Sequence, residues 1–157
     1  MAQGYLDNEE GRDPARTPMQ WHTVANSGFT AKGSDPWLPL ANNYRTVNVD
    51  QQKGDPTSTF EFYRSLIALR QRLPALQRGS FAIVENAPEN ALIYLRQYNE
   101  QRLLIVINFA DTEFVLDLSH LAQGVVLQLS SRFTAMEDIN IESVAVKAHE
   151  SLLLQLD

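Results

Sequence analysis

The chain has 157 residues, of which 44% are hydrophobic and 20% charged, and its formal net charge is −6. This composition is that of a globular protein, and the length suits one domain or a small domain with an appendage. The negative charge and the absence of a basic run disfavour nucleic acid as a partner, and the absence of cysteine excludes disulfides and thiolate metal sites.

No apolar run approaches the roughly 20 residues that cross a bilayer, so we expect no membrane partner. The lack of cysteine fits a reducing compartment, and we expect a cytoplasmic protein. The three histidines, His22, His120 and His149, are too far apart in sequence to form a metal-binding pattern. We therefore expect them to have surface or loop roles, with neither a metal nor another cofactor.

The first 54 residues contain many glycines and prolines and show no hydrophobic period. An irregular segment of this length is unusual inside a compact domain, yet its aromatic residues argue against intrinsic disorder. We interpret it as part of a larger folded body. Trp21 and Trp37 could stack on sugar rings, but anchoring a glycine-rich loop is the commoner use of such residues, and we favour it.

A helix is predicted next, from about Pro56 to Leu73. Asp55 supplies an N-cap and Pro56 suits the first helical position. The apolar residues Phe62, Leu66, Leu69 and Leu73 follow at helical spacing, and Pro74 ends the pattern.

After Gly79 the hydrophobic period changes from that of a helix to that of strands, which predicts a domain boundary. Asn99-Glu100-Gln101 has the composition of a hairpin connection, and the run from Leu103 to Ile107 is apolar on both faces, as expected of a central strand. Seven short strands with turns between them predict an antiparallel β-sandwich with its own core. The candidate strands are Phe81–Glu85, Leu92–Tyr98, Leu103–Phe109, Phe114–Leu118, Val125–Leu129, Ile139–Val146 and Ser151–Leu156.

The segment from Gly11 to Trp21 reads GRDPARTPMQW and is typical of an ordered loop pinned by proline. It resembles the GRDPxRTPMQWD motif of bacterial α-glucosidases and oligo-1,6-glucosidases of the α-amylase superfamily. The resemblance continues, in the same order and at similar spacing, through the segments Asn26–Thr30, Pro36–Pro39, Asp55–Arg70 and Leu104–Phe109.

This resemblance implies a fold and a division of the chain. Residues 1–79 would be the last part of a (β/α)8 barrel, and residues 80–157 the β-sandwich that follows it. The expected fold class is mainly β with one helix. The family consists of retaining hydrolases, whose two catalytic carboxyl groups lie about 5 to 5.5 Å apart. In the family these groups precede the motif, so we expect no catalytic residue in this chain and no activity of the chain alone.

Arg12 and Arg16 are the candidate substrate-binding residues, because a guanidinium donates paired hydrogen bonds to carboxylates or sugar hydroxyls. The resemblance implies that Arg12 lines the innermost sugar subsite, whereas Arg16 could instead brace Asp13. With an arginine on either side, Asp13 should stay ionised, which suits a brace and not a general acid. The chain departs from the motif at His22, where the family has aspartate, and at Ser27, where it has alanine.

Three functions stay open at this point. The first is the C-terminal part of a longer enzyme, the parent enzyme, that hydrolyses terminal α-linked glucose from short oligosaccharides. The second is part of a related glucosyl transferase or sucrose isomerase. The third, from another class, is a stand-alone carbohydrate-binding sandwich, for which Tyr94 and Tyr98 offer one pair of aromatic residues on a shared strand face. We also expect the chain alone to self-associate through residues 1–79, a surface that would otherwise pack on the missing part of the barrel.

Overall fold

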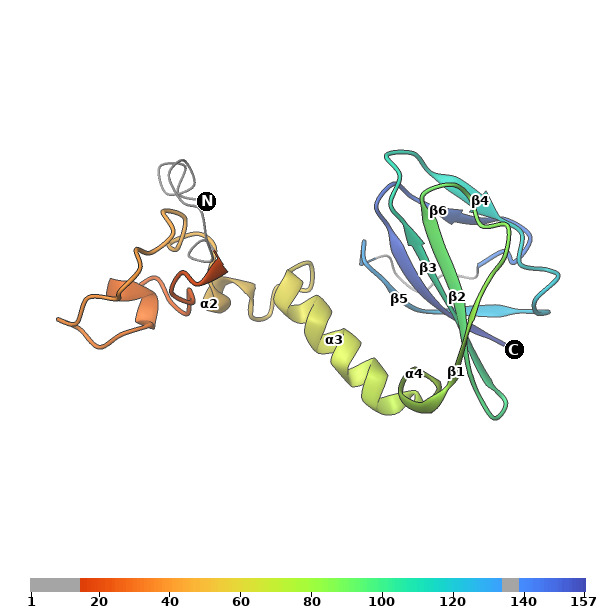
Figure 1. The fold of residues 1–157 in the computed structure, drawn as a ribbon, viewed down its shortest axis with the longest axis horizontal. Helices are drawn as coiled ribbons and strands as arrows, with labels where there is room; N and C mark the ends of the chain where they lie inside the picture. Colours follow the sequence, from red (N-terminus) through yellow and green to blue (C-terminus); the bar gives the residue numbers. More distant parts are fainter. Residues whose placement is uncertain (1–14, 134–138) are drawn as a thin grey trace. The chain divides into compact units, whose positions relative to one another are not determined.

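The computed structural model describes residues 15–133 and 139–157 (Figure 1). The chain forms two compact units that divide between Glu61 and Phe62. This division precedes Gly79 because the helical residues after Phe62 pack with the strands that follow them. The domain boundary at Gly79 stays a prediction.

In the N-terminal unit, regular structure is sparse between residues 15 and 58. A 3-10 turn, η2, spans Ala25–Gly28, and a four-residue helix, α2, spans Val49–Gln52. The side chain of Asn48 caps α2 by accepting a hydrogen bond from the Gln51 N–H at 3.0 Å. The sequence analysis missed α2, since four residues are too few to show a helical period.

The predicted helix is present, but its start was predicted wrongly. Helix α3 spans Thr59–Arg72. Asp55 instead accepts hydrogen bonds from the backbone N–H and hydroxyl of Thr57, at 2.9 and 2.7 Å, which form a turn and lower the pKa of the Asp55 carboxyl. The N-cap is Ser58, whose hydroxyl accepts from the Glu61 N–H at 3.2 Å. The sequence Ser-x-x-Glu at this place is a capping-box signal that the periodicity argument overlooked.

Pro74 ends α3, as predicted, and also begins a second short helix, α4, at Pro74–Arg78. Proline suits this position because the first N–H of a helix has no partner within the helix. The chain therefore has α2 and α4 in addition to the single helix that the sequence predicted.

The described residues after Gly79, 80–133 and 139–157, form two antiparallel sheets. The larger sheet has the order β1-β2-β3-β7-β5, and the smaller one pairs β4 with β6. Each strand falls within or close to one of the seven candidate segments. The strands are β1 (Ser80–Ile83), β2 (Ala91–Tyr98), β3 (Gln101–Asn108), β4 (Phe114–Leu116), β5 (Val125–Ser130), β6 (Val144–Val146) and β7 (Ser151–Leu156).

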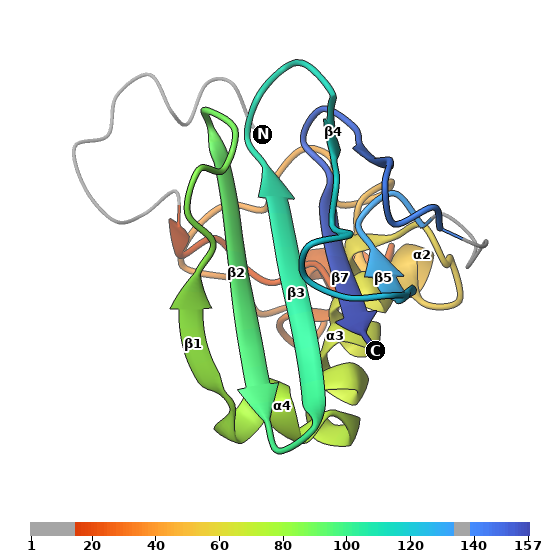
Figure 2. The ribbon, with the colours of Figure 1, turned by 90° about the vertical axis from the view of Figure 1, so that its right-hand side faces the viewer.

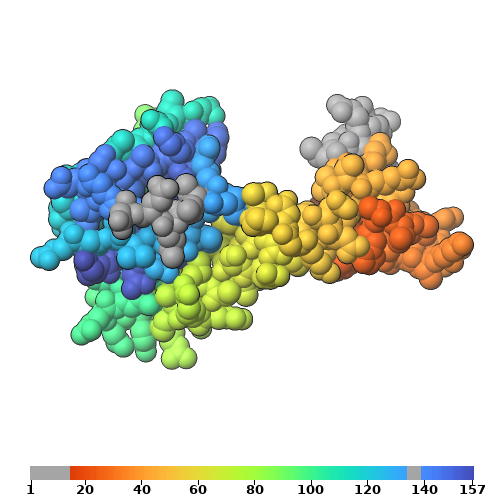
Figure 3. Space-filling view, turned by 180° about the vertical axis from the view of Figure 1, so that it is seen from behind, coloured from red at the N-terminus to blue at the C-terminus, as the bar shows by residue number. Residues whose placement is uncertain are grey.

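The larger sheet is covered on both faces, and Figure 2 shows α3 and α4 behind it. One face packs with the small sheet around a core that includes Leu104, Val106, Leu154 and Val146. On the opposite face, Leu103 and Leu153 pack with residues of α3 and α4. In Figure 3 the yellow-green surface of these helices adjoins the blue surface of the C-terminal strands.

The expected fold class, mainly β with antiparallel sheets, is confirmed. Strand β3 is central, and its residues Leu103 and Leu104 are both fully buried on opposite faces. Residues Asn99 and Glu100 connect β2 to β3, with Asn99 at a φ of 52°. Among the described residues, no helix is both long and apolar enough to cross a membrane.

Candidate functional site

The structure describes the motif GRDPARTPMQW only from Ala15 onward, so Arg12 and Asp13 lie outside the described residues. Arg16 is exposed, whereas Pro18 is buried. The segment thus presents Arg16 on the surface just before a proline that is packed into the N-terminal unit.

The end of the motif is attached to the start of helix α2. The carbonyls of Gln20 and Trp21 accept hydrogen bonds from the N–H groups of Val49 and Asp50, at 2.9 and 3.2 Å. The Gln20 side chain donates to the Val47 carbonyl at 2.5 Å. Because two backbone carbonyls and one side chain of two neighbouring residues are held in this way, the loop has one defined path across α2.

A buried turn holds the other side of the loop. The N–H groups of Trp21 and His22 both donate to the Ser27 carbonyl at 3.0 Å, and the Ser27 hydroxyl donates to the His22 carbonyl at 3.1 Å. Ser27 is fully buried. The buried hydroxyl that distinguishes it from the family's usual alanine therefore has a hydrogen-bond partner.

This turn needs glycine at position 28. Three successive residues, Asn26, Ser27 and Gly28, have left-handed φ angles of 52°, 53° and 70°. A Cβ atom on Gly28 would lie 2.5 Å from Cδ2 of His22. Glycine is thus favoured at position 28 by the left-handed backbone, and a larger residue would also displace the His22 ring.

His22 and Asp50 form a pair that the sequence analysis did not predict. Nδ1 of His22 lies 2.5 Å from Oδ2 of Asp50, and each side chain is 48% exposed. The pair links the loop to α2 and is an ion pair when His22 is protonated. His22 therefore lies in a loop, as expected. Its partner, Asp50, is 28 residues away, and the sequence near Asp50 gives no sign of the contact, apart from its position two residues after the cap residue Asn48.

The two tryptophans of this unit are exposed, Trp37 at 90% and Trp21 at 44%. The anchoring role favoured for Trp37 is wrong in this chain, because an anchor must be buried. Exposed aromatic and guanidinium side chains are suited to binding a neutral, hydroxyl-rich ligand and not to breaking its bonds.

Two further pairs of titratable side chains lie in the C-terminal unit. His149 pairs with Asp111 at 2.8 Å, and Lys147 pairs with Glu113 at 2.6 Å, which lowers the pKa of the Glu113 carboxyl. Within residues 15–133 and 139–157, no group of three His, Cys, Asp or Glu side chains could hold a metal ion. These pairs are exposed and lie near strand ends, as expected of surface contacts.

Comparison with known proteins points to the same superfamily as the motif does. Residues 2–79 match the family model of the α-amylase catalytic domain, and residues 81–152 match that of the maltogenic amylase C-terminal domain. The chain is 39% identical to the probable oligo-1,6-glucosidase 2 of Bacillus subtilis (strain 168) over 106 residues, which is 68% of this chain and 18% of that protein. It is 32% identical to the oligo-1,6-glucosidase of Bacillus cereus over 148 residues, or 94% of this chain and 26% of that protein.

Among solved structures, the trehalulose synthase MutB from Pseudomonas mesoacidophila MX-45 matches with a TM-score of 0.79 and 31% identity. The match covers 94% of this chain and 26% of MutB. The chain thus spans only about a quarter or less of the length of these relatives. Since both family models and the relatives agree with the motif, this chain belongs to the α-amylase superfamily and corresponds to the C-terminal part of its oligo-1,6-glucosidases.

Proposed function

We propose that this chain is the C-terminal part of a retaining α-glucosidase that removes terminal α-linked glucose from short oligosaccharides. The observation that carries the proposal is the continuous match of 94% of the chain to an oligo-1,6-glucosidase. We further propose that residues 1–79 complete the catalytic barrel and that residues 80–157 form the domain after it. The two family matches, which end at residue 79 and begin at residue 81, support this division.

In this proposal the chain binds substrate, and the catalytic carboxylates belong to the rest of the barrel. Arg12 holds the sugar in the innermost subsite through paired hydrogen bonds to its hydroxyls or to a neighbouring carboxylate. Arg16 is the second candidate for substrate contact. Support for a binding role of this loop comes from its fixed path, set by the bonds of Gln20, Trp21 and Ser27, and from the exposure of Arg16.

The parent enzyme would act by double displacement. A carboxylate attacks the anomeric carbon while a carboxylic acid protonates the leaving oxygen, and water then releases glucose from the glucosyl-enzyme. A guanidinium that orients the sugar contributes by holding it in the reactive position. We place this enzyme in the cytoplasm, which the absence of cysteine supports.

The test uses p-nitrophenyl α-glucoside with two proteins. The 157-residue chain alone should release no nitrophenol above the uncatalysed rate, whereas the full-length protein that contains it should turn over the substrate. In that protein Arg12→Ala should lower kcat/KM at least about tenfold, equivalent to ~1.4 kcal/mol of transition-state stabilisation. Arg45→Ala, which removes an exposed arginine whose guanidinium interacts with Tyr44, is the matched control.

Enzyme-like hydrolysis by the chain alone would show that catalytic groups lie within it. Near-normal turnover by the Arg12→Ala protein would remove this residue from the substrate site. An inactive full-length protein, with its fold intact, would overturn the proposed activity.

A second candidate is a glucosyl-transferring isomerase, which the match to trehalulose synthase favours. The two functions differ in whether water or the released sugar accepts the glucosyl group. Incubation of the full-length protein with sucrose separates them. Glucose and fructose in equal amounts indicate hydrolysis, whereas an isomeric disaccharide indicates transfer.

A further inference from the structure

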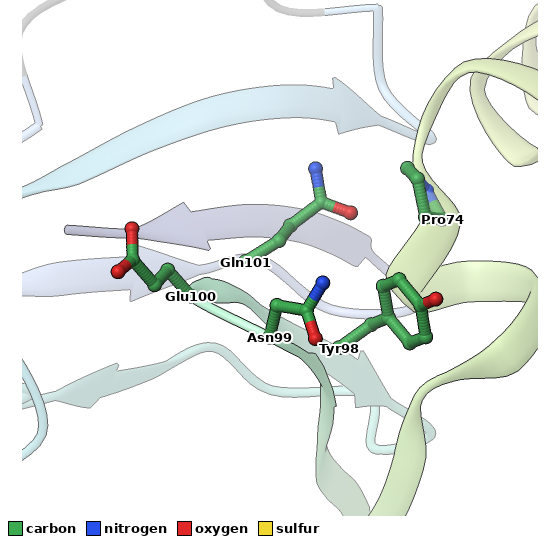
Figure 4. A pocket seen from close by; sticks show the side chains of 5 residues that line it. All are labelled: Pro74, Tyr98, Asn99, Glu100 and Gln101. Atoms are coloured by element: carbon green, nitrogen blue, oxygen red, sulfur yellow. The ribbon is translucent and has the colours of Figure 1, made fainter.

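We propose that the tip of the β2–β3 hairpin and the start of α4 form a binding site for a neutral hexopyranose unit. A pocket of about 520 Å³ lies here, lined by Pro74, Tyr98, Asn99, Glu100 and Gln101 (Figure 4). The pocket is an open depression at the surface and not an enclosed cavity, and its volume lies in the range of about 300 to 1,000 Å³ of small-molecule sites. All five residues belong to the C-terminal unit.

The walls of the pocket are held in place by the fold. Oε1 of Gln101 accepts a hydrogen bond from the Ala75 N–H at 2.9 Å, which joins the hairpin to α4. The Tyr98 ring packs against the apolar cluster that contains Leu103. Asn99 keeps the connection tight at a φ of 52°, and its carbonyl accepts from the Gln97 side chain at 3.2 Å. The Tyr98 ring and the Gln101 side chain are thus held in place before a ligand binds, which lowers the conformational entropy lost on binding.

The pocket presents polar groups that a ligand can use. The Tyr98 hydroxyl, the Asn99 amide, the Glu100 carboxylate and Nε2 of Gln101 form no hydrogen bond with other residues in the described part of the chain. Together they offer both donors and acceptors. Each hydroxyl of a sugar is both a donor and an acceptor, so it can form a hydrogen bond with any one of these groups.

The apolar part of the pocket and its charge narrow the class of ligand. The ring of Tyr98 and the ring of Pro74 provide carbon surface on which the C–H face of a pyranose can pack. The five lining residues include one carboxylate and no cation, which disfavours phosphorylated sugars. The pocket chemistry therefore fits a neutral, polyhydroxylated ring. The choice of an α-glucoside as ligand rests on the proposed function.

The experiment is a titration of the complete 157-residue chain with maltose, followed by two-dimensional amide NMR. Saturable shifts are expected at Ala75 and at residues 98–101. Glucose 6-phosphate should bind at least about threefold more weakly because of the Glu100 carboxylate.

The test variant combines Asn99→Gly with Glu100→Ala. Glycine accepts the left-handed φ of residue 99, so the hairpin connection is kept while its amide is lost. With two ligand bonds removed, the dissociation constant for maltose should rise at least about fivefold. The matched control is Asn86→Gly, since Asn86 also has a left-handed φ, 59°, but does not line the pocket.

Three results would overturn this site: no saturable shift at the hairpin, equal binding by the test variant, or equal loss in the control. Shifts confined to residues 15–61 would also overturn it and would leave the proposed function standing. Conversely, hairpin binding by a full-length protein without glucosidase activity would overturn the proposed function and leave this site in place.

Discussion

At the scale of single residues, His22 shows how a departure from the family motif is accommodated. An aspartate at this place, as in the family's motif, would bring a second carboxylate towards Asp50, whose Oδ2 lies 2.5 Å from Nδ1 of His22. Two carboxylates close together disfavour the doubly ionised state. The histidine instead offers a ring N–H to the Asp50 carboxylate, and its ring covers Gly28. The histidine at position 22 is therefore compatible in charge and hydrogen bonding with the aspartate at position 50.

We predict that His22→Asp lowers the stability of the N-terminal unit by about 1 kcal/mol, the upper part of the range for exposed pairs. Adding Asp50→Asn to this variant should restore most of the loss, because it removes the repulsion. Urea unfolding followed by Trp21 fluorescence, in a Trp37→Phe background, measures the effect. The control is Thr23→Asp, which adds the same charge at the next exposed position. Equal losses in the control and in His22→Asp would contradict the pairing.

At the scale of elements, the success of the sequence analysis depended on how local each signal is. Strand β3 was predictable because Leu103 and Leu104 face opposite apolar layers, so the whole run is apolar. Helix α3 was predictable from its stripe but not at its start, where Ser58 and not Asp55 provides the cap. The contact between His22 and Asp50 has no local signal, because it depends on the path of a long irregular loop.

The N-cap of α3 gives a prediction at this scale. Ser58→Ala removes the acceptor of the Glu61 N–H and should cost about 1 kcal/mol at the first turn of the helix. Protection of the Glu61 amide against hydrogen exchange should fall about fivefold if that turn opens locally. Ser65→Ala, at an exposed position inside α3, is the control and should be neutral or slightly stabilising. Unchanged protection of Glu61 would show that the cap is not what fixes the start of the helix.

At the scale of the whole molecule, part of the apolar stripe on α3 is covered by the chain's own sheet. Leu69 and Leu73 are buried against strand residues, and Phe62 and Leu66 line an apolar pocket of about 320 Å³ on the sheet. Tyr63 and Ile67, by contrast, are 60% and 56% exposed. Exposed apolar surface that is grouped on one element favours association.

We therefore predict that the 157-residue chain self-associates through residues 1–79, including this face of α3. Sedimentation velocity over about a hundredfold range of concentration should show a rising average mass, because association follows mass action. Replacing both Tyr63 and Ile67 by Glu should shift the association midpoint to higher concentration by at least about tenfold, since each introduced carboxylate would have to lose water at the contact. Gln71→Glu, which adds a charge at another exposed position of α3, should shift the association midpoint much less.

A strict monomer at every concentration would refute the prediction. Association that is insensitive to the double variant would place the contact elsewhere than on this face of α3.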